Sequence, residues 1–278
     1  YPYRIVNLQD TTYSDSMRGA MSQGFGLIMD DVGALFGGLG SVPMTMILGI
    51  NRGGGLEGMH AFTIVNPWAD DTHGVFQMVV AHEAVHSWIG IRLGDLEDPW
   101  WKEGTTNYLG FLIALRQGLC TQAFAAQTFL ADLSDSLDVV NYALSDPLLR
   151  SHLFAPDSDF IDLVYVKGAQ VTMLMDHAIR RTSSATTGID ELLGQFVDIH
   201  GGGAFTRAQY EGFLESRSGA VLDGIFSAFV DQPGPIPPDT LQHAYDWLLS
   251  AGAFSPQPIS PHPAARTAEP PSAAITHY

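Results

Sequence analysis

His82, Glu83 and His86 form the pattern HExxH inside an apolar run that extends from Val75 to Ile89. Such a run predicts a buried helix, and histidines four positions apart lie one above the other on the same helix face. Their imidazole nitrogens can therefore converge on one metal ion, with the glutamate between them placed for proton transfer. The pattern predicts a metal centre with a neighbouring base.

A catalytic zinc ion needs three protein ligands and one open position, so the pattern requires a further donor. Glu103 is the best candidate, because it opens a helix expected from Trp100 to Gln117 that a short connection can fold back against the first. In an arbitrary helix, a first-turn glutamate is better explained by the helix dipole. Because the HExxH pattern precedes Glu103, metal ligation is the better explanation here.

The composition excludes several classes of function. The 278 residues carry 30 acidic and 13 basic side chains, a net charge of -17. A surface of this charge repels phosphates, so we expect no nucleic-acid partner and no adhesion to anionic membranes. No apolar run reaches the length of about eighteen residues that a membrane-spanning helix requires, so we also expect no membrane insertion.

Cys120 is the only cysteine, which excludes an intrachain disulfide and a cysteine-rich zinc site. The chain starts at Tyr1 without an initiator Met or a signal-peptide pattern, so we expect a processed or trimmed start. We expect a soluble protein, periplasmic or secreted in preference to cytoplasmic. The sequence predicts no oligomeric state.

The elements before the HExxH helix follow the order strand, glycine loop, strand. Apolar runs at 42–50 and 61–66, bounded by Pro and Gly, predict the strands, and 51–58 predicts the loop between them. Residues 1–23 have a mixed pattern, and 24–40 has helical character interrupted by glycines.

The second half of the chain is almost wholly helical in its pattern. After the helix at 100–117, helical periodicity covers 121–144, 164–181, 188–199, 207–216 with Thr206 as N-cap, and 239–249. From about Phe254 the chain is rich in Pro, Ala and Ser, which indicates a weakly ordered tail.

The loop Gly53-Gly54-Gly55-Leu56-Glu57-Gly58 also satisfies the dinucleotide-binding fingerprint G-x-G-x-x-G. That reading requires a helix after the loop to hold a pyrophosphate, whereas the next segment predicts a strand. A glycine turn that merely joins two strands is the more serious alternative.

HExxH, a Trp-rich segment and Glu103-Gly104 together resemble the gluzincin metallopeptidases, which include the aminopeptidase N family. Sixteen residues, Ser87 to Lys102, separate the second histidine from Glu103, somewhat fewer than is usual in that family. The resemblance implies one Zn²⁺ per chain, held by His82, His86 and Glu103.

The glycine loop resembles the exopeptidase loop of the glycyl aminopeptidase family, in which a histidine stands where this chain has Gly58. The resemblance implies that Glu57 binds the free α-ammonium of the substrate and that Gly54 and Gly55 let the backbone approach the peptide. The peptides would then be substrates with a free N-terminus.

Val164 to Ala169 contains Tyr165-Val166-Lys167-Gly168, which resembles the Tyr-x-Lys-Gly segment of these peptidases. The resemblance implies that Tyr165 contacts the oxyanion of the transition state. Phe205-Thr206 and 229–237 also resemble the glycyl aminopeptidase family, so the likeness covers roughly residues 24–250.

The implied fold class is α+β, with a thermolysin-like metallopeptidase catalytic domain whose small sheet packs on the HExxH helix, followed by a mainly helical lobe. We expect a zinc-binding lobe at 1–145, a helical lobe that completes the active-site cleft at 146–250, and a Pro/Ala-rich tail at 251–278.

The implied function is a zinc aminopeptidase that removes small N-terminal residues, Gly or Ala. Zinc would lower the pKa of its bound water to about 7, and Glu83 would accept the proton and pass it to the departing amine. Two alternatives stay open: a thermolysin-like endopeptidase, and a catalytically weak interaction module.

Residues that orient the imidazoles are expected but not identified by the sequence. Asp70, Asp71, Asp95 and Asn107 are near enough to consider, and each is better explained as a solvated loop or helix residue. Among the other histidines only His60, three positions after Glu57, could line the same site.

Overall fold

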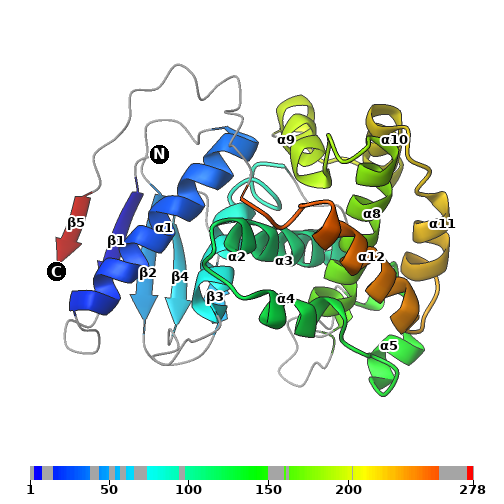
Figure 1. The fold of residues 1–278 in the computed structure, drawn as a ribbon, viewed down its shortest axis with the longest axis horizontal. Coiled ribbons are helices and arrows are strands. Elements are labelled where there is room, and N and C mark those ends of the chain that lie inside the picture. Colours follow the sequence, from blue (N-terminus) through cyan, green and yellow to red (C-terminus); the bar gives the residue numbers. More distant parts are fainter. Residues whose placement is uncertain are drawn as a thin grey trace. The chain divides into compact units, whose positions relative to one another are not determined.

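A computed structural model describes residues 3–7, 15–37, 44–49, 54–56, 61–65, 74–93, 98–149, 160, 163–201, 203–256 and 274–277 (Figure 1). The chain divides into two compact units: unit 1 takes 1–92, 109–124 and 256–278, and unit 2 takes 93–108 and 125–255. Helix α3, Pro99–Arg116, contributes residues to both units. The predicted division at residues 145 and 250 stays a prediction.

Unit 1 contains a five-stranded sheet with the strand order β3-β4-β2-β1-β5 (Figure 1). The strands are β1 (Tyr3–Asn7), β2 (Met44–Gly49), β3 (Gly54–Leu56), β4 (Ala61–Val65) and β5 (Ala274–His277). All neighbouring pairs are parallel except β3 with β4, which is antiparallel.

The strands predicted at 42–50 and 61–66 are confirmed as β2 and β4. The predicted loop at 51–58 is wrong for Gly54–Leu56, which pair with β4 through the backbone as β3. The predicted weakly ordered tail is likewise wrong for Ala274–His277, which pair with β1. Backbone pairing of this kind needs no apolar pattern in the short strand, so composition does not reveal it.

Helices α1 (Asp15–Phe36) and α2 (Val75–His86) pack against each other in unit 1. A Cβ at Gly24 of α1 would come within 2.5 Å of the end of the Gln77 side chain, so the two helices lie close together at this point. Phe25 of α1 meets Phe62 of the sheet edge-on, with ring centroids 5.6 Å apart. An aromatic contact thus joins helix α1 to the sheet.

Unit 2 is built mainly from helices, as the sequence predicts. After α3 come α4 (Gln122–Phe129), which begins in unit 1, and then α5 (Leu137–Asn141), η1 (Leu163–Lys167), α8 (Gly168–Thr182), α9 (Ile189–His200), α10 (Arg207–Ser218), α11 (Asp223–Ile225), η2 (Phe226–Val230) and α12 (Pro238–Ser250). The elements η1 and η2 are π-helical turns. None of the helices within the described ranges has the length and apolar character that a membrane crossing requires.

The N-cap predicted at Thr206 is confirmed and is part of a capping box. The Thr206 hydroxyl accepts a hydrogen bond from the Gln209 backbone N–H at 3.3 Å, and Gln209 Oε1 accepts from the Thr206 N–H at 2.8 Å. The two residues satisfy donors that the first turn of α10 leaves without helical partners.

The single helix predicted over 121–144 is wrong, because it is interrupted between α4 and α5. Asp132 Oδ1 accepts a hydrogen bond from the Ser134 backbone N–H at 3.0 Å, and Gln170 donates to the Ala131 carbonyl at 2.9 Å. Side chains therefore occupy backbone groups here that a continuous helix would use.

A buried network of charges joins three elements of unit 2. Asp176 on α8 accepts hydrogen bonds from the Tyr108 hydroxyl at 2.6 Å and the Ile189 backbone N–H at 2.8 Å. Arg180 donates to Asp176 at 2.9 Å and to Asp190 at 2.8 Å. Burial, together with the charge of Asp176, raises the pKa of Tyr108, so its phenol remains the donor. The network fixes α3, α8 and the start of α9.

Replacing Asp176 by Ala is expected to lower the free energy of unfolding by about 3–5 kcal/mol, because the buried Tyr108 phenol loses its acceptor and the buried Arg180 loses one of its two. The matched control is Asp231→Ala, which removes the acceptor of an exposed pair with Arg207 and is expected to cost about 0–1 kcal/mol. Urea unfolding followed by circular dichroism measures both. Equal losses in the two variants would contradict the importance of the buried network.

Candidate metal centre

Gly74 lies immediately before α2 and has a φ of 84°, in the left-handed region. A Cβ at this position would also lie 2.0 Å from the Leu119 carbonyl oxygen. Only glycine meets both conditions without strain. Gly74 therefore allows the chain to enter α2 where it packs closely on residues 119 and 120.

Apolar residues on all sides of α2 are buried, including Phe76, Val80 and Val85. A helix that is apolar all round belongs in a protein interior. His82, Glu83 and His86 are polar exceptions within it, with exposed fractions of only 5%, 6% and 1%. Three buried ionisable groups on one turn require compensating partners, and this indicates a functional site.

The two imidazoles point their Nε2 atoms toward each other. His82 Nε2 and His86 Nε2 lie 3.0 Å apart, and His86 Nδ1 lies 3.3 Å from the Ile89 carbonyl oxygen. Because a carbonyl only accepts hydrogen bonds, the proton of neutral His86 belongs on Nδ1. Its Nε2 then carries the lone pair that a metal requires.

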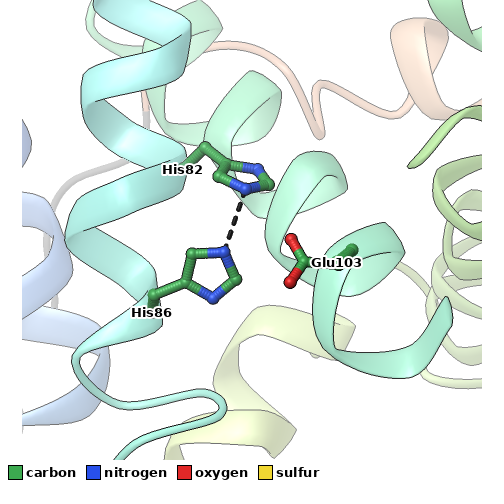
Figure 2. Close-up of side chains that lie close together, drawn as sticks. All are labelled: His82, His86 and Glu103. Carbon is green, nitrogen blue, oxygen red and sulfur yellow. Dashed lines mark hydrogen bonds between the residues drawn. The ribbon is translucent and has the colours of Figure 1, made fainter. Parts of the chain in front are cut away.

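Glu103 completes a group of three possible ligands. One ligand atom from each of His82, His86 and Glu103 lies within 4.8 Å of the others, and all three residues are buried. Figure 2 shows the two rings, one turn apart on α2, with the Glu103 carboxylate facing them from α3. The Lys102 ammonium lies 3.8 Å from Glu103 Oε1. The structure thus brings the predicted ligands together.

The orientation of α3 explains why Glu103 faces the histidines. A Cβ on Gly110 would lie 3.0 Å from the backbone nitrogen of His82, so the two helices approach closely at this point. Glu103 precedes Gly110 by seven residues, which is about two helical turns, so both lie on the same face of α3. The face that touches His82 is therefore the face that carries Glu103.

The geometry and chemistry of this group fit a zinc ion. Two ligands of one tetrahedral zinc, each at about 2.0–2.2 Å from the metal, are separated by roughly 3.3 Å. The observed separation of the two Nε2 atoms is 3.0 Å. Two imidazoles with one carboxylate also form a ligand set that is typical of catalytic zinc. The residues present therefore suit the metal that the sequence predicts.

Glu83 is buried on the same helix but is not among the three possible ligands. Consecutive residues of a helix point about 100° apart, so its side chain leaves α2 in a different direction from His82. Glu83 thus follows the ligand His82 directly in α2 without belonging to the ligand set.

Tyr165 lies in η1 and is half-buried. Its backbone carbonyl accepts a hydrogen bond of 3.2 Å from the Asn107 side-chain amide on α3. Gly104 and Gly168 also meet closely, since a Cβ at Gly104 would lie 2.5 Å from Gly168 Cα. The segment that carries Tyr165 is thus held against the half of α3 that carries Glu103.

Lys167 of the Tyr-x-Lys-Gly segment is buried, and its ammonium donates to the Gln232 carbonyl at 3.3 Å. Burial lowers the pKa of this lysine to about 8. The side chain anchors the end of η1 to the chain that follows η2.

Glu57, Gly58 and His60 lie outside the described residues, so their predicted positions are untested. Gly54 and Gly55 lie in β3, and β3 packs against α2 within unit 1. A second acidic group, Glu211, Glu215 and Asp223, is half-buried to exposed and contains no imidazole. Glu215 there accepts a hydrogen bond from the Leu222 backbone, which is a structural role.

Two groups near the site were missed from the sequence. Asn107 was expected to be solvated, and this is wrong, because it is buried and bonded to the Tyr165 carbonyl. The acceptor for His86 is the Ile89 backbone carbonyl. Every residue type carries such a carbonyl, so no side-chain pattern could identify it.

Comparisons with known proteins show likeness in fold. No family profile matches the chain, and no curated protein matches it in sequence. An aminopeptidase N family protein from Idiomarina loihiensis matches 86% of this chain with a TM-score of 0.70 and 15% identity. The M1 zinc metallopeptidase from Deinococcus radiodurans matches 82% with a TM-score of 0.56 and 22% identity, and a form bound to a Tyr-Ser-Ala substrate matches 83% with a TM-score of 0.58 and 21% identity.

The chain spans about half the length of these solved proteins, since it covers 46% of the first, 46% of the second and 47% of the third. At these identities the comparisons establish a common fold. The chain has a mostly helical fold with a small sheet, and this fold is similar to that of these solved proteins.

Replacing Gly110 by Ala is expected to weaken metal binding roughly tenfold to a hundredfold, as happens when groups that orient metal ligands are changed. The added methyl group would press on the His82 backbone and move the two helices apart. Competition with a chelator measures the affinity.

The control is Gly212→Ala on α10, where no atom lies within 4 Å of the new Cβ. This change is expected to stabilise the fold by about 0.5–1 kcal/mol and to leave metal affinity unchanged. Unchanged metal affinity in Gly110→Ala would refute the proposed dependence of the ligand set on this contact.

Proposed function

We propose that this chain carries the active site of a zinc-dependent aminopeptidase with a thermolysin-like catalytic domain. The observation that supports it most is the convergence of His82, His86 and Glu103 within a fold like that of M1 zinc metallopeptidases. Two helices, packed together at Gly110, present three buried donors that suit one metal ion.

His82, His86 and Glu103 would hold the zinc ion, which would supply Lewis-acid chemistry for a peptide carbonyl and for water near neutral pH. Glu83 accepts the proton from the attacking water on its carboxylate. It then donates this proton to the departing amine, so the same group acts as base and as acid. Its burial supports this role, because a carboxylate shielded from bulk solvent transfers protons selectively to bound reactants.

Tyr165 donates its phenol proton as a hydrogen bond to the oxyanion that forms when the carbonyl is attacked. A preplaced donor of this kind typically contributes about 2.7–4 kcal/mol to transition-state stabilisation. The link between the Tyr165 backbone and Asn107, one turn after Glu103 on α3, supports a position near the reacting carbonyl.

Glu57 binds the free α-ammonium of the peptide and so defines where the substrate begins. It directly follows β3 in the chain, and β3 packs against α2, the helix that carries the two histidines. Gly54 and Gly55 leave the backbone open to the peptide, and small N-terminal residues, Gly or Ala, are the preferred substrates. A Deinococcus relative in fold has been solved with a Tyr-Ser-Ala substrate, which supports peptide binding.

The purified protein is expected to bind about one zinc ion per chain and to release amino acid from Gly- and Ala-anilides. Replacing Glu83 by Gln should keep the zinc and lower kcat by about 10²–10⁴, because the base is lost while the ligands remain. Replacing His86 by Ala should remove the zinc as well. Elemental analysis and anilide hydrolysis separate the two effects.

The decisive negative result is a stably folded, metal-free protein without turnover, which would favour a metallopeptidase-like interaction module. Peptidase activity that remains after chelation, or that remains in Glu83→Gln, would also contradict the proposed mechanism.

Replacing Glu57 by Gln is expected to raise KM for a free peptide at least tenfold, because the α-ammonium loses its charged partner. The same change should leave zinc content unaltered. An N-acetylated peptide provides the complementary test, since it lacks the ammonium group. Rapid cleavage of this peptide at internal bonds would identify an endopeptidase instead.

A further inference from the structure

Asn107 is a buried amide that the proposed chemistry does not use. It lies on α3 four residues after Glu103, so the two side chains project from the same face of the helix, one turn apart. Its Nδ2 donates to the backbone carbonyl of Tyr165 at 3.2 Å. One helix face thus carries both a predicted zinc ligand and the contact to the predicted oxyanion donor.

The acceptor belongs to an unusual piece of backbone. Leu163–Lys167 form a π-helical turn that continues directly into α8. A π turn contains an extra residue, so it disturbs the regular pairing of carbonyls with N–H groups and is commonly found at functional sites. A side-chain donor from a neighbouring helix can stabilise such a turn by satisfying one of its carbonyls.

The π turn determines the direction of the Tyr165 side chain. Each helical residue rotates the chain by about 100°, so removing the extra residue of the turn would rotate the side chains before it by up to about that angle relative to α8. The close contact of Gly104 with Gly168 fixes the start of α8 against α3, and Lys167 fixes the end of η1. Neither of these contacts involves the middle of the turn. The Asn107 amide does contact it, through the Tyr165 carbonyl.

We propose that Asn107 is a positioning residue that holds the π turn of η1 and thereby directs the Tyr165 hydroxyl toward the substrate carbonyl. The inference rests on the proposed peptidase function for its kinetic consequence. The contact between Asn107 and the π turn does not depend on that function, and it can be tested separately.

Asn107→Leu keeps the size of the side chain and removes the donor. The expected result is a fall in kcat of about tenfold, the factor that corresponds to one lost buried hydrogen bond, with KM and zinc content unchanged. In a Tyr165→Phe background the same substitution should have almost no further effect, because the hydroxyl that it positions is already absent.

The matched control is Thr105→Val, which removes a buried hydrogen bond of 3.4 Å between the Thr105 hydroxyl of α3 and the Thr172 hydroxyl of α8, outside the π turn. Its effect on kcat, whatever its size, should multiply with that of Tyr165→Phe. Should Asn107→Leu fail to fold, Asn107→Ala removes the donor without filling the space.

Hydrogen exchange measured by mass spectrometry tests the contact without any substrate. Amides within 163–170 should exchange faster in Asn107→Leu than in the unaltered protein, and Thr105→Val should not change them selectively. Unchanged exchange in this segment, or multiplying effects of Asn107→Leu and Tyr165→Phe on kcat, overturns the inference. If the unaltered protein hydrolyses no peptide, the proposed function fails, while the exchange result still decides whether Asn107 holds the π turn.

Discussion

Helix α3 approaches its neighbours through two glycines, and the position of Glu103 depends on both. Gly110 lies against the backbone of His82 on α2, and Gly104 lies against Gly168 at the start of α8. Larger residues would keep the helices apart, since a Cβ at Gly104 would overlap backbone atoms. The carboxylate of Glu103 is therefore placed by backbone packing, which is stiffer than a long side chain and less easily displaced.

The structure buries charged groups in two ways. Asp176, Arg180 and Asp190 compensate one another through direct hydrogen bonds within unit 2, so this network needs no external ligand. His82, His86 and Glu103 are equally buried but present acceptor atoms to a common point. A cation would interact favourably with all three of these ligand atoms at once. The network around Asp176 stabilises the fold. The group of His82, His86 and Glu103 lowers the stability of the metal-free fold and forms a binding site.

Much of the site could be predicted because its residues follow strict spacing rules. The four-residue interval between His82 and His86 depends only on helical geometry, and Glu103 could be chosen because it opens the next helix along the chain. The helical half followed from periodicity and from caps such as Thr206. The short strands β3 and β5 could not be predicted from periodicity, because they form through backbone pairing with other strands. The break between α4 and α5 was missed for a related reason: one of its hydrogen bonds comes from Gln170, far along the chain.

The division of the chain into units has a consequence for folding order. Unit 2 takes most of its residues from one continuous stretch, 125–255, whereas unit 1 combines 1–92 with 109–124 and with the distant segment 256–278. Helices joined by short connections find their contacts quickly, while a sheet assembled from distant segments must first close large loops. Unit 2 therefore has the topology of the faster-folding part. Since α3 supplies residues to both units, its first half can be held by helical neighbours before the strands of unit 1 have paired.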